Sequence, residues 1–150
     1  MLALPISLSF DVAVRPKVLN MSDGEGAGLE GKLVAIIDDD AAVRDSTRML
    51  LEIHDIPAET YQSGAEFLER KPEVVCLIVD YQMPGMDGLE FIAAARKQGV
   101  QTPAIMITAT SNASLERRAA ELGVSQVLRK PLAMQALLGA LRRELHKRGS

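Results

Sequence analysis

Short apolar runs alternate with amphipathic stretches along most of this chain, and no other feature constrains its fold as strongly. The runs have the length and β-branched content of buried strands, and the stretches between them carry apolar residues at helical spacing. The expected strands are 33–37, 58–62, 73–80, 102–108 and 125–129, and the expected helices are 42–54, a short one from 63, 88–98, 111–122 and 132–147. This order indicates right-handed βαβ units and an α/β fold with a parallel sheet.

Composition and charge argue against several other classes of protein. The 150 residues suit one domain, and 47% hydrophobic with 25% charged residues is an ordinary globular composition. The formal net charge is -3 without a basic stripe, so we expect no direct nucleic-acid binding. No uninterrupted apolar run reaches the length of a membrane span, so we expect no membrane contact. The one cysteine, Cys76, lies in an apolar run and suits a buried position in a reducing compartment, the cytoplasm.

The first 31 residues differ from the rest of the chain. Residues 21–31 are rich in glycine and acidic residues, which is typical of a flexible leader. Met21 is an alternative start of the chain. We therefore expect a leader at 1–31, a folded domain at 32–147 and a tail at 148–150.

Charged and hydroxyl side chains stand where the expected strands end. Asp38 and Asp39 follow the first strand, and Asp80 ends the third. Thr108 ends the fourth strand, and Lys130 follows the fifth. In an open α/β sheet, ligands bind at the carboxyl ends of the strands. We therefore expect these side chains to meet in one crevice.

These side chains are chemically complementary. Clustered carboxylates repel one another unless a cation lies between them, and oxygen donors without histidine or thiolate suit Mg²⁺. A carboxylate is also a nucleophile that forms an aspartyl phosphate. Lys130 offers positive charge to phosphoryl oxygens, and the Thr108 hydroxyl offers a hydrogen-bond donor. The set therefore predicts Mg²⁺-assisted phosphoryl transfer to a carboxylate of this cluster.

Each of these residues has an ordinary explanation when taken alone. An acid at a strand end is usually a solvated loop residue or a helix N-cap, and the N-cap is the role expected of Asp40. Lys130 alone would be a surface lysine, and Thr108 alone a common strand residue. Their joint placement at the ends of different strands is what makes the combination specific.

Four motifs resemble those of the receiver domain of bacterial response regulators. They are Ile36-Ile-Asp-Asp-Asp40, Leu77-Ile-Val-Asp-Tyr-Gln-Met-Pro-Gly-Met-Asp-Gly-Leu-Glu90, Ile107-Thr-Ala109 and Leu128-Arg-Lys-Pro131. The resemblance covers roughly Lys32 to Lys147. It implies a flavodoxin-like, doubly wound sheet of five parallel strands in the order 2-1-3-4-5, with five helices.

The resemblance also implies roles for single residues. Asp80 would take a phosphoryl group from the phosphohistidine of a sensor histidine kinase or phosphotransfer protein, and Thr108 and Lys130 would contact that group. The implied Mg²⁺ ligands are the carboxylates of Asp38, Asp39 and Asp80 and the backbone carbonyl of Gln82. Gln82 and Thr110 would line the approach of the water that slowly hydrolyses the acyl phosphate. The domain would thus be a signalling module rather than an enzyme.

One position departs from the family pattern. The family often has an aromatic residue three positions before the lysine, where this chain has Val127. In the family that ring couples to the threonine as a rotamer switch. We therefore expect signalling here to depend on Thr108 and on backbone shifts near the fourth strand and the helix after it.

The expected output is a contact with a downstream protein. No helix-turn-helix or catalytic module follows Lys147, which indicates a stand-alone receiver. The family's usual contact surface is the helix 4–strand 5–helix 5 face, which would hold a target or a second copy in a homodimer. The last helix carries a broad apolar stripe, most of it needed for core packing.

Two other functions compete with this prediction. A receiver-like scaffold for protein interaction that is never phosphorylated would have no need of the five site residues. A Mg²⁺-dependent aspartyl phosphatase needs a second acid two positions after its nucleophile, where this chain has Gln82. Such enzymes usually carry a cap domain as well, for which there is no room here. A phosphorylatable signalling module therefore explains the sequence best.

Overall fold

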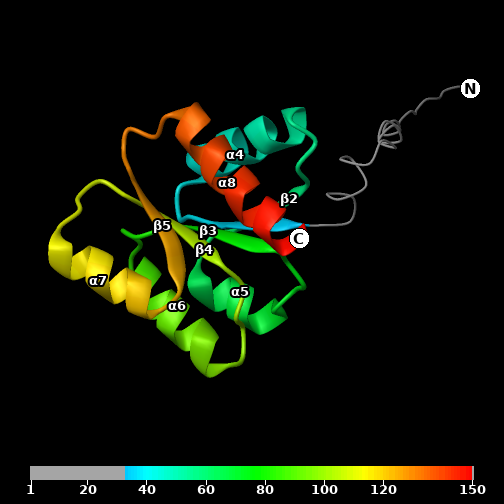
Figure 1. The fold of residues 1–150 in the computed structure, drawn as a ribbon. Coiled ribbons are helices and arrows are strands. Elements are labelled where there is room, and N and C mark those ends of the chain that lie inside the picture. The colour runs from blue at the N-terminus through cyan, green and yellow to red at the C-terminus, as the bar shows by residue number, and fades with distance from the viewer. Residues whose placement is uncertain (1–32, 150) are drawn as a thin grey trace, which may run out of the picture. The chain divides into compact units, whose positions relative to one another are not determined.

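A five-stranded parallel sheet forms the centre of the computed structural model, which describes residues 33–149 (Figure 1). The strands are β1 (Val34–Ile37), β2 (Ala58–Tyr61), β3 (Cys76–Asp80), β4 (Ala104–Thr108) and β5 (Val124–Arg129). They lie in the order β2-β1-β3-β4-β5, and every neighbouring pair is parallel. The α/β fold and the strand order 2-1-3-4-5 expected from the sequence are confirmed.

Helices cover both faces of this sheet. They are α4 (Ala41–Ile53), α5 (Gly64–Arg70), α6 (Gly88–Lys97), α7 (Ala113–Glu121) and α8 (Met134–Gly149). In Figure 1, α4 and α8 lie on one face, and α5, α6 and α7 lie on the other. The doubly wound arrangement is therefore confirmed for residues 33–149. The expected leader at 1–31 lies outside the described residues.

The central strands are apolar except for the last residues of β3 and β4, because helices bury them from both sides. All residues of β1, β3 and β4 are buried, including the acid and the hydroxyl that end β3 and β4. Burying one large aliphatic side chain stabilises a fold by roughly 1.5–3 kcal/mol. Such strands therefore make the sheet rigid, and a rigid sheet fixes the positions of the residues that follow each strand.

Some element boundaries differ from the sequence-based expectation. β3 begins at Cys76 rather than at residue 73, because its partner β1 begins at Val34, directly opposite Cys76. β4 begins at Ala104, since Pro103 has no N–H to give to a ladder. The last helix runs to Gly149, two residues beyond the expected end. No helix between residues 33 and 149 has the length and apolar character needed to cross a bilayer.

Helix caps fix the start of the helices that follow the strands. The Asp40 carboxylate accepts from the N–H groups of Ala42 and Val43 at 2.9 and 3.3 Å, which confirms its expected role as the N-cap of α4. At α6, Asp87 and Glu90 form a reciprocal capping box. Both caps lie at the carboxyl edge of the sheet, where they hold the loops after β1 and β3 in place.

Two helical glycines are expected to respond oppositely to alanine. A Cβ at Gly88 would lie 2.8 Å from both the carbonyl oxygen of Asp80 and the Cα of Tyr81, so Gly88→Ala forces the loop after β3 to move. We expect it to lower the free energy of unfolding by about 1–3 kcal/mol. At Gly139 the nearest atom is a flexible arginine nitrogen 3.8 Å away, and Gly139→Ala should stabilise by about 0.5–1 kcal/mol. Urea denaturation of both variants tests this; equal effects would contradict it.

Candidate functional site

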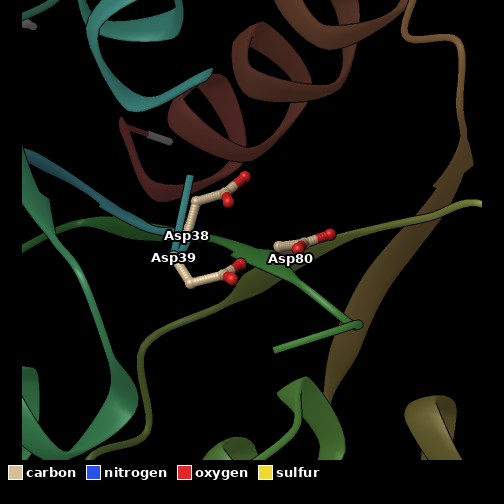
Figure 2. Close-up of side chains that lie close together, drawn as sticks. All are labelled: Asp38, Asp39 and Asp80. Atoms are coloured by element: carbon tan, nitrogen blue, oxygen red, sulfur yellow. The ribbon is translucent and has the colours of Figure 1, made fainter. Parts of the chain in front are cut away.

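Three carboxylates meet at the carboxyl edge of the sheet (Figure 2). Asp38 and Asp39 follow β1, and Asp80 ends β3, which lies beside β1 with Ile37 opposite Val79. One carboxylate oxygen from each of the three acids lies within 4.8 Å of the others. Asp38 and Asp80 are only 7% and 4% exposed, whereas Asp39 faces solvent. The strand register therefore brings together the acids that the sequence placed at separate strand ends.

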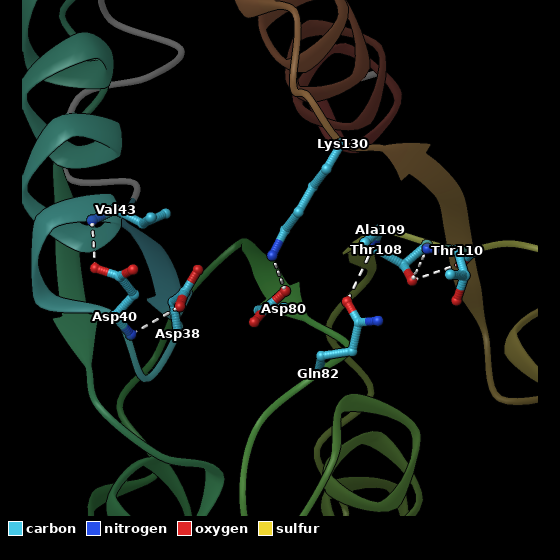
Figure 3. Close-up of polar contacts among 9 residues, drawn as sticks. All are labelled: Asp38, Asp40, Val43, Asp80, Gln82, Thr108, Ala109, Thr110 and Lys130. Atoms are coloured by element: carbon cyan, nitrogen blue, oxygen red, sulfur yellow. Dashed lines mark hydrogen bonds and ion pairs between the residues drawn. The ribbon is translucent and has the colours of Figure 1, made fainter.

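Lys130 reaches this cluster from across the sheet. It follows β5, and its Nζ lies 2.9 Å from Oδ1 of Asp80 (Figure 3). Apart from this ion pair, that oxygen has no hydrogen-bond partner among residues 33–149. Partial burial lowers the pKa of Lys130, but the nearby carboxylate of Asp80, with Asp38 and Asp39 behind it, outweighs burial and raises that pKa overall. The lysine is therefore a fixed positive charge beside Asp80.

The electrostatics of the cluster favour a bound cation or proton. Burial, reinforced by the charge of Asp80, raises the pKa of Asp38 from 3.8 to about 6, although the Asp40 N–H donates to Oδ1 at 2.9 Å and opposes the shift. The Arg44 guanidinium donates to the backbone carbonyl of Asp38 at 2.7 Å, and so anchors this residue to α4. At neutral pH Asp38 is mostly ionised, and its buried negative charge destabilises the cluster unless a positive charge compensates it.

The expected magnesium site fits these residues. The three acids supply hard oxygen ligands, and no histidine or thiolate belongs to the described cluster, which matches the donor preference of Mg²⁺. The raised pKa of Asp38, caused mainly by burial and then by the charge of Asp80, shows that negative charge is unfavourable here, and a bound cation would relieve this. The residues are therefore suited to hold a divalent cation.

Thr108 lies at the same edge, but its hydroxyl is engaged within its own loop. The side chain is fully buried, and Oγ1 donates to the carbonyl of Thr110 at 2.6 Å and accepts from its N–H at 3.2 Å. The backbone of Thr108 is fixed by β5, since its carbonyl accepts from the Lys130 N–H at 2.8 Å. The hydroxyl must therefore exchange partners before it can donate to a group bound at Asp80.

The Gln82 side chain makes a hydrogen bond that the sequence did not predict. Its Oε1 accepts a hydrogen bond from the backbone N–H of Ala109 at 3.1 Å (Figure 3). Ala109 was not expected to belong to the site, because a backbone donor leaves no trace in residue type. The only available signal was its place directly after the strand-ending Thr108.

An apolar pocket of about 210 Å³ adjoins the acids on the side of α4 and α8. Beside Asp80 and Lys130, its walls come from Val43 and Thr47 of α4 and from Leu132. Apolar walls lower the local dielectric and strengthen the ion pair beside them. The pocket therefore adds to the electrostatic isolation of Asp80 on this side.

Comparison with known proteins agrees with this fold. The family model of the response regulator receiver domain matches residues 34–142. The transcriptional regulatory protein FixJ of Azorhizobium caulinodans is 33% identical over 114 residues, covering 75% of this chain and 54% of that protein. The response regulator MprA of Mycobacterium sp. (strain KMS) is 32% identical over 118 residues, covering 76% and 50%. The chain thus spans about half the length of these curated relatives.

Solved structures give the same result. The chemotaxis protein CheY4 of Vibrio cholerae superimposes with a TM-score of 0.70 at 29% identity, covering 75% of this chain and 97% of that one. A response regulator receiver protein from Burkholderia phymatum gives 0.66 at 34% identity, covering 77% and 95%. The fold and the site together define a doubly wound α/β protein that has an acidic pocket and a lysine paired with one of its acids. The chain belongs to the response regulator receiver domain family of two-component systems.

Family membership sets the general biochemistry. Receiver domains are signalling domains rather than classical enzymes, and they generally bind Mg²⁺ at an acidic pocket. They generally interact with histidine kinases or phosphotransfer proteins. Family membership does not assign roles to individual residues of this chain, which are proposed below.

Proposed function

We propose that this domain takes a phosphoryl group on Asp80 from the phosphohistidine of a histidine kinase or phosphotransfer protein. The observation that carries the proposal is the state of Asp80. Its carboxylate is buried, pairs with Lys130 at 2.9 Å, and leaves Oδ1 without another partner among the described residues. A structural acid would normally satisfy its oxygens with several donors. The lack of a second partner at Oδ1 is better explained if Asp80 is a reactive acid than if it has only a structural role.

The transfer is a displacement at phosphorus. A carboxylate oxygen of Asp80 attacks the phosphorus atom, the P–N bond breaks, and the imidazole leaves with the electron pair of that bond and then takes a proton from water. Lys130 exchanges its contact with Asp80 for the phosphoryl oxygens, and the Thr108 hydroxyl turns from Thr110 toward them. The expected Mg²⁺ ligands are Asp38, Asp39, Asp80 and the Gln82 backbone carbonyl. When bound, the ion neutralises negative charge on the transferred group.

The proposed output is a change in protein contacts, within a receiver unit spanning 32–147. The helix 4–strand 5–helix 5 face corresponds here to α7, β5 and α8, and would contact a downstream target or a second copy. Val127, where the family often has an aromatic ring, is partly buried against the core. We therefore assign the conformational readout to Thr108 and the loop after β4. The domain would act in the cytoplasm. Hydrolysis of the acyl phosphate by water that approaches past Gln82 and Thr110 would end the signal.

A single incubation separates this function from a receiver-like scaffold. The protein is mixed with Mg²⁺ and acetyl phosphate, and its intact mass is measured. We expect an acid-labile gain of about 80 Da, the mass of one phosphoryl group on a carboxylate. No gain would favour the scaffold, and rapid multiple turnover of small phosphate esters would favour a phosphatase.

Removing the positive charge of Lys130 should slow phosphorylation. Lys130→Met keeps an unbranched apolar stem but loses the ammonium group that pairs with Asp80. We expect an initial rate from acetyl phosphate at least about 100-fold lower, the usual effect of losing one preorganised charge or donor at a reacting group. Lys147→Met, at an exposed lysine of α8, is the matched control. Equal rates for Lys130→Met and wild type would remove Lys130 from the reaction.

A further inference from the structure

The Gln82 side chain makes a hydrogen bond for which the proposed phosphoryl transfer has no use. Its Oε1 accepts from the Ala109 N–H at 3.1 Å, which ties the loop after β3 to the loop after β4 (Figure 3). We propose that Gln82 is a positioning residue that holds the Ala109 amide in the unphosphorylated domain and releases it to a phosphoryl group on Asp80. This inference rests on the proposed function.

The strand register brings the Ala109 amide to the phosphorylation site. Asp80 lies opposite Ile107, and the Tyr81 N–H donates to the Ile107 carbonyl at 2.8 Å. The chain after Asp80 therefore runs beside the chain after Ile107, which brings Gln82 next to Ala109. The sheet bonds of this end of β4 use the Ile107 and Thr108 carbonyls. The Ala109 N–H is directed to the edge of the sheet instead, where Gln82 accepts it.

A phosphoryl group needs donors that this edge already uses. It brings three strongly accepting oxygens, of which Lys130 and a metal ion satisfy only part. The Thr108 hydroxyl donates to Thr110 at 2.6 Å, and the Ala109 N–H donates to Gln82. Both neutral donors at the end of β4 are therefore engaged within the protein before phosphorylation.

The direction of the exchange follows from charge. An N–H group donates more strongly to an anionic phosphoryl oxygen than to a neutral amide oxygen. The Ala109 N–H would therefore leave Gln82 once Asp80 is phosphorylated, and the link between the two loops would break. The hydrogen bond between Gln82 and Ala109 must break when the phosphoryl group binds. It therefore weakens phosphoryl binding by the free energy of one exposed hydrogen bond. Its release also gives the loop after β4 a route to report phosphorylation without an aromatic ring at Val127.

Beryllofluoride binding tests the proposal without interference from hydrolysis. Trifluoroberyllate mimics a phosphoryl group on a carboxylate, and its affinity is measured by titration at Mg²⁺ concentrations that saturate every variant. We expect Gln82→Ala and Gln82→Leu to bind it about 2- to 12-fold more tightly, the factor that one neutral hydrogen bond contributes to an equilibrium constant. Gln82→Glu should bind it more weakly, because the added charge strengthens the hold on Ala109 and repels the anion. Since Gln82 and Ala109 are exposed, these changes leave the core intact.

The Ala109 amide resonance reports directly whether this N–H changes its hydrogen-bond partner when the mimic binds. It should shift on beryllofluoride binding in wild type, and should already be displaced in free Gln82→Ala. Gln101→Ala, at an exposed glutamine before the amino end of β4, is the matched control and should leave the affinity unchanged.

The possible outcomes separate this inference from the proposed function. If wild type binds the mimic but Gln82→Ala and Gln82→Leu bind it equally or more weakly, Gln82 does not restrain Ala109 and the inference fails alone. If wild type neither binds the mimic nor gains a phosphoryl group, the proposed function fails and the inference with it.

Discussion

Asp80→Asn is expected to abolish the acid-labile mass gain that acetyl phosphate and Mg²⁺ produce in wild type. An amide oxygen is a poor nucleophile and cannot form an acyl phosphate, so the loss should be complete rather than partial. The fold should survive the change, because asparagine has nearly the same shape and Asp80 Oδ1 gives up only the pairing with Lys130. Intact mass spectrometry gives the extent of phosphorylation, and circular dichroism checks the fold.

The matched control is Asp55→Asn. Asp55 is an exposed acid that precedes β2, at the opposite edge of the sheet, and its φ of 63° suits asparagine as well as aspartate. It should be phosphorylated like wild type. An undiminished mass gain in Asp80→Asn would place the phosphoryl group on another residue and overturn the proposed function.

Asp38→Asn is expected to raise the stability of the metal-free protein while weakening Mg²⁺ binding. The pKa of Asp38 is about 6 in the folded protein, against 3.8 ordinarily, so the folded state binds more protons than the unfolded state between these values. Stability of the metal-free wild type therefore falls as pH rises from about 4 to about 6, and the loss is complete above that range. Asparagine keeps the acceptor for the Asp40 N–H and removes the charge.

Two measurements follow from this. At pH 7.5 without metal, we expect Asp38→Asn to have a free energy of unfolding about 1–3 kcal/mol higher than wild type. The size of the pKa shift of Asp38 sets the upper end of this range. In Mg²⁺ titrations it should bind at least about tenfold more weakly, since a divalent ion loses one anionic ligand. Asp45→Asn, on the exposed face of α4, should change neither quantity appreciably. A metal-free Asp38→Asn that is less stable than wild type at this pH would contradict the electrostatic account.

The sequence predicted the fold well because the signals for a parallel sheet are local. Apolar runs such as 34–37 are buried on both faces, and strand-ending acids leave a clear break in the pattern. The strand order came only from the resemblance to receiver domains, since an alternation of strands and helices does not specify which strands are neighbours. The ends of the strands were predicted less accurately, because they depend on the neighbouring strand. For example, β3 begins at Cys76 because its partner β1 begins at Val34, directly opposite.

The site was predictable in its residue types and less so in its contacts. Acids and a lysine at strand ends indicated that Asp38, Asp39, Asp80 and Lys130 meet at one edge, because parallel strands end there. The sequence did not indicate that Lys130 pairs with Asp80. Nothing in the sequence indicated that the hydroxyl of Thr108 donates to its own loop. The Ala109 amide, bound by Gln82, was equally invisible, since backbone donors are common to nearly all residue types.

Borohydride trapping of the phosphorylated protein tests the central claim most directly. Borohydride reduces an acyl phosphate to an alcohol, so a phosphorylated aspartate becomes homoserine and the residue loses about 14 Da. After treatment with acetyl phosphate and Mg²⁺, followed by digestion and peptide mass spectrometry, we expect this loss at Asp80 and at none of Asp38, Asp39 or Asp40. Homoserine at another aspartate, or at none while the 80 Da gain persists, would contradict the assignment of Asp80 as the phosphoryl acceptor.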